Sequence, residues 1–288
     1  MAEQDKTQGA VDAQGGQRLD SLRVRIDEVD RELLALLSRR ARLAQEVGEL
    51  KKTTDAPVYR PEREALIMRK LREANPGPLP GAAIEAVWRE IVSACRELER
   101  RMRVAYLGPA GTFSEQALLK HFGSGVDPIA CATIDEVFRA TEAGTVDFGV
   151  VPVENSTEGA VNHTLDLFLE TSLAISGEVL VPVRQNLMSL GGTLEGVTRI
   201  VSHAQSLAQC IGWLDRNCPG IERVPVASNA EAARLASLDA ATAAIAGEKA
   251  AARYGLGLVA RSIQDDPNNR TRFAVVGRYA CEIGRAHV

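Results

Sequence analysis

Two cations, Arg40 and Lys51, stand eleven residues apart in a proline-free stretch, so a helix would place them on nearly the same face. Arg40 also fills a slot in a row of apolar residues, where a buried guanidinium is costly unless an anion meets it. One interpretation is that both side chains line a pocket for an anion, and that Arg23, which faces elsewhere, serves the equivalent pocket of a second copy. The alternative is that Arg40 pairs with a glutamate to set coiled-coil register and that Arg23 is a solvated charge.

A second group of polar residues, Glu154, Asn155 and Ser156, follows the apolar run VDFGVVPV. Open α/β sheets bind ligands at the carboxyl ends of their strands, so Asn155 and Ser156 are candidate ligand contacts. The segment DDPNNRTRFAVVG places Thr271 and Arg272 at the start of another predicted strand. Thr271 could donate a proton over a short distance. Arg272 could clamp a carboxylate with two hydrogen bonds, or it could support Thr271 from behind.

Four predicted helix starts share the pattern S/T-x-x-E/Q before an apolar run, which is typical of a capping box. They are Thr112 with Glu115, Thr133 with Glu136, Ser202 with Gln205, and Ser228 with Glu231. Helix capping is the simple interpretation. Helix starts also bind carboxylates through backbone N–H groups without basic side chains, which makes Thr112 and Gln205 candidate ligand contacts.

The elements that must position these residues change in character near residue 103. Residues 1–103 carry 20 Lys and Arg against 18 Asp and Glu, whereas residues 104–288 carry 14 against 20. Glycine and aromatic residues are rare in residues 18–103, which is typical of an all-helical region. Beyond it, short β-branched runs alternate with alanine-rich amphipathic stretches, which indicates an α/β domain. We therefore expect a helical domain over 18–102 after a disordered leader (1–17), and an α/β domain over 103–280.

The helical region predicts a dimer. Apolar residues recur at heptad spacing from Leu22 to Leu50. Some 33 residues give a helix of roughly 50 Å, which is too long for one small domain to cover and so needs a partner, most simply a second copy. A second predicted helix carries Arg63 and Glu64. A third, from about residue 82 to 100, carries Cys95 and Glu99 on one face.

Composition excludes several classes of protein. The 288 residues are 45% hydrophobic and 25% charged, with a net charge of −4, as in ordinary globular proteins. No apolar run approaches the ~18 residues of a membrane span, and the N-terminus lacks the layout of a secretory signal. Five cysteines without metal-ligand spacing indicate a reducing compartment. We expect a cytoplasmic protein with no metal, no cofactor, no membrane and no nucleic-acid partner.

The run LRVRIDEVDRELLALLSRRARLAQEVGELK, followed by APVYRPERE and WREIVSACRELE, resembles the all-helical chorismate mutase family over about residues 18–102. The resemblance implies a long-helix intertwined dimer. It also implies a pericyclic rearrangement of a dicarboxylate, which needs no nucleophile and no cofactor. Lys51 is implied to donate to the ether oxygen and Glu64 to bind the ring hydroxyl. The other implied substrate contacts are Arg23 from the partner chain, Arg40, Arg60, Arg63, Cys95 and Glu99.

Three positions depart from the best-known members of that family. Arg60 stands where an aspartate can occur, Cys95 where a serine can, and Glu99 where a glutamine can. An ionised Glu99 beside the ether oxygen would repel the charge that develops there. We therefore expect Glu99 to act as a protonated donor, and we expect the rearrangement to slow as pH rises.

The segments AYLGPAGTFSEQA, VPVENSTEGAVNHTLDLF, SHAQSLAQC, SNAEAA and NRTRF resemble the prephenate dehydratase family over about residues 104–277. The resemblance implies two α/β lobes of the periplasmic-binding-protein type, with the second lobe over about 184–263 and the site in the cleft. Thr271 is implied to be the proton donor, with Thr112, Asn155, Ser156, Gln205 and Arg272 as substrate contacts. His203 could be a contact or a structural residue, whereas His121 and His163 are interpreted as structural.

The whole chain resembles fusions of these two families in phenylalanine biosynthesis. Most dehydratases continue into an ACT regulatory domain, but only eleven residues follow the matched region (104–277) here. Codons for the tail EIGRAHV would resemble a common sequencing adapter, so we expect residues 281–288 to be non-native. Two alternatives remain open: a non-catalytic dimeric small-molecule sensor, and a dehydratase that prefers arogenate.

Overall fold

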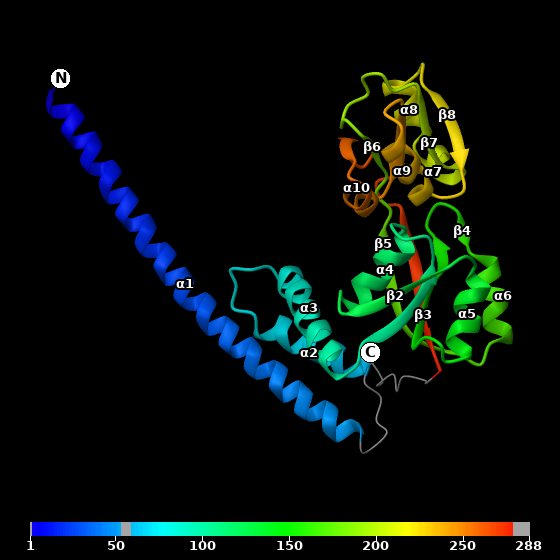
Figure 1. The fold of residues 1–288 in the computed structure, drawn as a ribbon, viewed down its shortest axis with the longest axis horizontal. Helices are drawn as coiled ribbons and strands as arrows, with labels where there is room; N and C mark the ends of the chain where they lie inside the picture. Colours follow the sequence, from blue (N-terminus) through cyan, green and yellow to red (C-terminus); the bar gives the residue numbers. More distant parts are fainter. Residues whose placement is uncertain (1, 53–58, 279–288) are drawn as a thin grey trace. The chain divides into compact units, whose positions relative to one another are not determined.

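The computed structural model describes residues 2–52 and 59–278 (Figure 1). The chain divides into two compact units, one of residues 1–58 with 98–100 and one of residues 59–97 with 101–288. The predicted non-native tail lies outside the described residues. The predicted order, a helical region followed by a two-lobed α/β domain, is confirmed.

The first unit is dominated by one helix, α1 (Ala2–Lys52), drawn in blue in Figure 1. It begins well before residue 18, the expected start of the helical domain, so residues 2–17 are helical where the sequence predicts a disordered leader. That stretch contains no proline, and nothing in its backbone stops a helix that is already nucleated downstream. Further along, α1 leaves large apolar side chains open to water: Ile26 is 58% exposed and Leu50 is 69% exposed.

Two shorter helices follow, α2 (Pro61–Ala74) and α3 (Gly81–Glu99). α2 begins with a proline, whose missing N–H would have no partner within the helix at that position. Two glutamates in its first turn also stabilise the start, because they lie near the positive end of the helix dipole. The buried face of α3 includes Ser93 and Cys95. Gly123, with φ of 76°, approaches Ser93 so closely that an added Cβ would lie 2.5 Å from the serine Cβ.

The first lobe of the α/β domain is built on a sheet with the order β2-β1-β3-β11-β5 and a short β4 on β3. β1 runs parallel to β2 and β3, and β11 runs antiparallel to β3 and β5. The strands are β1 (Met102–Leu107), β2 (Val126–Cys131), β3 (Phe148–Asn155), β4 (Gly159–Ala160), β5 (Ala174–Pro182) and β11 (Arg270–Gly277). The helices of this lobe are α4 (Phe113–Phe122), α5 (Ile134–Glu142) and α6 (Asn162–Glu170).

The second lobe has a sheet of order β10-β6-β9-β7-β8, in which β7 is parallel to β8 and β9. Its strands are β6 (Asn186–Ser189), β7 (Arg199–His203), β8 (Glu222–Val226), β9 (Thr242–Ala246) and β10 (Gly257–Ala260). Its helices are α7 (Ala204–Gln209), α8 (Ile211–Asn217), α9 (Asn229–Leu238) and α10 (Glu248–Tyr254). Buried alanines on α9 and β9 let this helix pack closely on the sheet.

The chain passes from the first sheet to the second between Pro182 and Asn186, and it returns between Ala260 and Arg270. The returning strand, β11, enters the first sheet between β3 and β5. This insertion aligns the end of β3 with the start of β11, so that Asn155 and Thr271 are direct partners although 116 residues separate them.

Three of the four predicted caps are confirmed: the hydroxyls of Thr112, Thr133 and Ser228 accept the N–H groups of Glu115, Glu136 and Glu231. The prediction for Ser202 is wrong. The cap residue of α7 is the next residue, His203, and its side chain makes no capping bond. Ser202 lies near the end of β7, where its buried hydroxyl donates to the carbonyl of Ile245 at 2.7 Å. This bond to the neighbouring strand β9 holds the hydroxyl that a helix cap would require.

Candidate active sites

The α/β domain contains a cavity of about 460 Å³, here called the interlobe cavity, which is lined by residues of both lobes. Its walls are the carboxyl ends of parallel strands, at Leu107, Asn155, His203, Ala227 and Gly247. Ligands of open α/β folds bind at this end of the strands. Among the residues that the structure describes, no lysine or arginine lines this cavity.

A hydrogen-bonded pair of side chains, Thr271 and Asn155, lines the interlobe cavity. The Asn155 amide donates to the Thr271 Oγ1 atom at 2.9 Å and to the Asn269 Oδ1 atom at 3.0 Å. The Asn155 Oδ1 atom accepts the backbone N–H of Thr157 at 3.0 Å, so the amide is fixed on both sides. Because Thr271 accepts from Asn155, its own proton is left for a group in the cavity.

Two of the residues predicted as contacts lie off the cavity wall. Ser156 accepts the backbone N–H of Arg270 at 3.0 Å and so fixes the loop that leads into β11. Arg272 does not line the interlobe cavity, so its role as a clamp for a substrate carboxylate stays a prediction. Successive side chains on a strand point to opposite faces, so with Thr271 toward the cavity Arg272 points away. It forms ion pairs with Glu154 at 3.4 Å and Glu178 at 3.3 Å.

The second lobe supplies a buried polar network to the cavity floor. Asn229 accepts a hydrogen bond from the Ser206 hydroxyl at 2.9 Å, and its Oδ1 atom lies 3.1 Å from the Ser202 hydroxyl oxygen. Gln185, from the segment that crosses between the lobes, donates to Ser206 at 2.9 Å. Gln185, Ser206 and Asn229 line the cavity beside Gln205. Sequence reasoning missed these residues and Asn269, although Asn229 and Asn269 lie inside the recognised SNAEAA and NRTRF segments.

The three described histidines of the α/β domain have different surroundings. His203 lines the interlobe cavity. His163 is exposed and lies 2.8 Å from Asp135, a hydrogen bond that lowers the pKa of that aspartate. The His121 ring lies 2.7 Å from the Tyr59 hydroxyl. Burial, with Arg89 and Arg96 nearby, lowers the pKa of His121 to about 4, so its ring is neutral at pH 7.

In the first unit, the helical region brings Lys51 and Glu99 together. The Lys51 ammonium lies 3.1 Å from Glu99 Oε2, and the two side chains are 22% and 11% exposed. Gly48 makes this approach possible: a Cβ at that position would lie 2.8 Å from the Glu99 Cγ atom. The carboxyl group that the sequence-based hypothesis assigns as a donor therefore lies against a cation.

Other candidates on α1 are spread along the helix. Arg40 is partly buried, while Arg23 is exposed and pairs with Asp20 at 3.1 Å. At 1.5 Å per residue, Arg23 lies about 42 Å from Lys51 along one helix. The two residues therefore cannot contribute to one pocket within a single chain.

The second unit holds the remaining helical candidates. Arg60 and Arg63 are exposed at the start of α2, and Cys95 is a buried free thiol on α3. Glu64 forms an ion pair with Arg96, which sequence reasoning did not single out.

Arg96 is a buried guanidinium, only 4% exposed. It also donates to the Phe122 carbonyl and stacks over the Tyr59 ring, with 5.1 Å from its Cζ atom to the ring centroid. A buried cation with a carboxylate, a carbonyl and an aromatic face around it holds α2, α3 and α4 together.

Comparison with known proteins assigns the helical region and the α/β region to two different families. The family model described as chorismate mutase type II matches residues 22–100, and the model described as prephenate dehydratase matches residues 104–280. The chain is 53% identical over 267 residues to the bifunctional chorismate mutase/prephenate dehydratase of Stutzerimonas stutzeri, covering 90% of this chain and 73% of that protein. It is 43% identical over 266 residues to the protein of the same name from Aquifex aeolicus, covering 91% and 74%.

Among solved structures, the prephenate dehydratase of Arthrobacter aurescens in complex with L-Phe matches with a TM-score of 0.58 and 36% identity. That match covers 62% of this chain and 61% of the other. Over residues 2–52 and 59–278, no helix is both long and apolar enough to cross a membrane. In the same residues, no three histidine, cysteine or acidic side chains are grouped so that they could hold a metal ion.

Proposed function

The chain belongs to the family of bifunctional chorismate mutase/prephenate dehydratases, and from this membership we infer two activities that act in succession. The helical part rearranges chorismate to prephenate, and the α/β part converts prephenate to phenylpyruvate in phenylalanine biosynthesis. The roles of individual residues below are our proposal.

For the dehydratase, we propose Thr271 as the donor to the leaving C4 hydroxyl. The observation that carries this proposal is the 2.9 Å hydrogen bond from Asn155 to Thr271, which orients the hydroxyl and leaves its proton for the substrate. The C4–O bond breaks as the hydroxyl leaves as water, and the ring carboxylate departs as CO₂. The electrons of its C–C bond complete the aromatic ring, and solvent returns a proton to Thr271.

Prephenate carries two carboxylates, and no described lysine or arginine lines the interlobe cavity. We propose that the N-terminus of α4, where Thr112, Phe113 and Ser114 line the cavity, binds one of them through backbone N–H groups. Gln205 and His203 reach the cavity from the second lobe and are proposed as further contacts. Ser156 is proposed to act indirectly, because it holds the segment that carries Thr271.

For the mutase, we propose that Lys51 donates to the ether oxygen of chorismate, where negative charge develops. The nearby Glu99 carboxyl supports this placement, since substrate that enters between the two groups meets both. From the family resemblance, Arg40, Arg60 and Arg63 are proposed to bind the substrate carboxylates. Glu64 is proposed to bind the ring hydroxyl and Cys95 to be a further substrate contact.

We propose that the mutase works as a homodimer through α1. The exposed apolar residues of α1, such as Ile26, Leu36 and Leu50, need a cover that a second α1 would provide. The distance of Arg23 from Lys51 along the helix supports a role for Arg23 in the partner's pocket. We also propose a cytoplasmic location, because the four described cysteines are free thiols.

The test is a coupled assay on the whole purified chain. Chorismate is supplied, and chorismate loss and phenylpyruvate appearance are followed separately. Thr271→Ala should stop only phenylpyruvate formation, and the matched control Thr198→Ala, at an exposed threonine of the second lobe, should stop neither. Prephenate and arogenate are also supplied directly, so that substrate preference is read in the same assay. If neither chorismate nor prephenate is consumed, the result would favour a non-catalytic sensor.

A further inference from the structure

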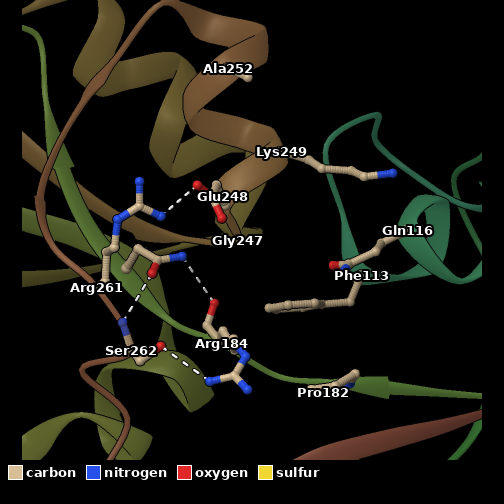
Figure 2. A pocket seen from close by; sticks show the side chains of 11 residues that line it. Phe113, Gln116, Pro182, Arg184, Gly247, Glu248, Lys249, Ala252, Arg261 and Ser262 are labelled. Atoms are coloured by element: carbon tan, nitrogen blue, oxygen red, sulfur yellow. Dashed lines mark hydrogen bonds and ion pairs between the residues drawn. The ribbon is translucent and has the colours of Figure 1, made fainter. Parts of the chain in front are cut away.

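A second cavity, of about 420 Å³, adjoins the interlobe cavity (Figure 2). Phe113 and Gly247 line both cavities, so the two share a wall. We call the second one the basic pocket because Arg184, Lys249 and Arg261 line it. Glu248 is the one carboxylate in its described lining, which leaves the pocket with a net charge of +2.

The three cations are not equally available. Arg261 donates to Glu248 at 2.5 Å, so its charge is largely compensated. Among the described residues, the Arg184 side chain makes one long contact, 3.5 Å, with the Ser262 hydroxyl. Figure 2 shows the Arg184 guanidinium and the Lys249 ammonium on either side of the Phe113 ring in this view. Arg184 and Lys249 are therefore the groups best placed to attract an anion.

Hydrogen bonds of a buried asparagine fix the backbone of the wall that carries Arg184 and Arg261. The buried Asn186 accepts the backbone N–H of Ser262 at 3.0 Å and donates to the backbone carbonyl of Arg184 at 3.3 Å. One amide thus joins the two segments through which the chain crosses between the sheets. The backbone that bears Arg184 is tied to the backbone next to Arg261.

The charges of the two cavities contrast. The described lining of the interlobe cavity holds Glu158 and no lysine or arginine, although the substrate of the proposed dehydratase is a dianion. We propose that the basic pocket is an anion subsite for that dicarboxylate: Arg184 and Lys249 attract it and hold one carboxylate as it moves past Phe113 into the interlobe cavity. This role rests on the proposed function, and charged clefts of this kind raise association rates by about 10–10³-fold.

The test is dehydratase kinetics on the full chain with prephenate at about 20 and about 200 mM salt, concentrations between which screening changes strongly. The double variant R184Q/K249Q should lose about tenfold in kcat/KM at low salt while kcat stays within about twofold, and its salt dependence should flatten. E248Q should raise kcat/KM, because it frees Arg261. R216Q, which removes an exposed cation of the same lobe that lines neither cavity, is the matched control. Urea denaturation followed by circular dichroism reports the folding of each variant.

The proposal is overturned if R184Q/K249Q behaves like R216Q, or if E248Q also lowers kcat/KM. A binding arm separates this failure from failure of the proposed function. Prephenate is titrated calorimetrically into T271A chains, with and without R184Q/K249Q. About tenfold weaker binding in the triple variant supports the subsite whether or not the wild type turns prephenate over. Equal binding, with unchanged kinetics, refutes it.

Discussion

Acid should destabilise the protein through His121, whose ring contacts the Tyr59 hydroxyl. Burial, with Arg89 and Arg96 nearby, lowers the pKa of His121 from 6.5 to about 4. In the unfolded chain His121 is therefore protonated as pH falls below about 6.5, whereas in the folded chain it is protonated only near pH 4. The stabilisation is present above pH 6.5 and is lost as pH falls through this window.

The size of this effect follows from the shift in pKa. A change of one unit in pKa corresponds to about 1.4 kcal/mol. If the whole shift of His121 acted on stability, acid would lower the free energy of unfolding by about 3 kcal/mol. The ring keeps some contact with water, so we expect a loss of about 2 kcal/mol by pH 4.5. This exceeds what one exposed ion pair contributes, so it should be measurable.

Urea denaturation of the whole chain, followed by circular dichroism from pH 7.5 to 4.5, tests this prediction. Carboxylates also titrate in this range, so the informative quantity is the difference between wild type and His121→Gln. Glutamine can still accept from the Tyr59 hydroxyl, but it does not titrate. His163→Asn, at the exposed histidine that pairs with Asp135, is the matched control. Parallel curves for wild type and His121→Gln would refute the reasoning.

Four further predictions concern the two sites and their support. Asn155→Ala should lower dehydratase kcat by about 10- to 100-fold and leave mutase activity unchanged, because the hydroxyl of Thr271 loses its orienting donor; equal rates would contradict this. Gly48→Ala should lower mutase but not dehydratase activity, because its Cβ would displace Glu99. Wild-type mutase activity should fall from pH 5 to 8 and Glu99→Gln should remove that fall; a flat wild-type profile would exclude the protonated-donor role. Arg96→Met should lower the unfolding free energy by about 3 kcal/mol in urea denaturation, because it leaves a carboxylate without its buried partner.

Several parts of the sites could be predicted because their signals are local. Thr112 begins a helix because its hydroxyl can accept an N–H three residues on, and the structure has that bond. The orientation of Arg272 was also within reach. The alternation of side chains along a strand already puts it on the face opposite Thr271.

Other features have no local signal. Arg96 looks like one more cation on an amphipathic helix, and only packing shows it buried beside Tyr59 and the Phe122 carbonyl. Gln185 carries no motif either, since it is defined by partners from distant segments, Ser206 and Asn229.

The sequence by itself determined the order of helical and α/β regions, the chemistry of the recognised motifs and the identity of Thr271 as a candidate donor. These follow from periodicity and residue type, which act over a few residues. Only the tertiary structure decided that Asn155 donates to Thr271 and that a basic pocket adjoins a cavity without described lysine or arginine in its lining. The physical reason is that β11 enters the sheet beside β3, and strand register sets contacts between residues far apart in the chain.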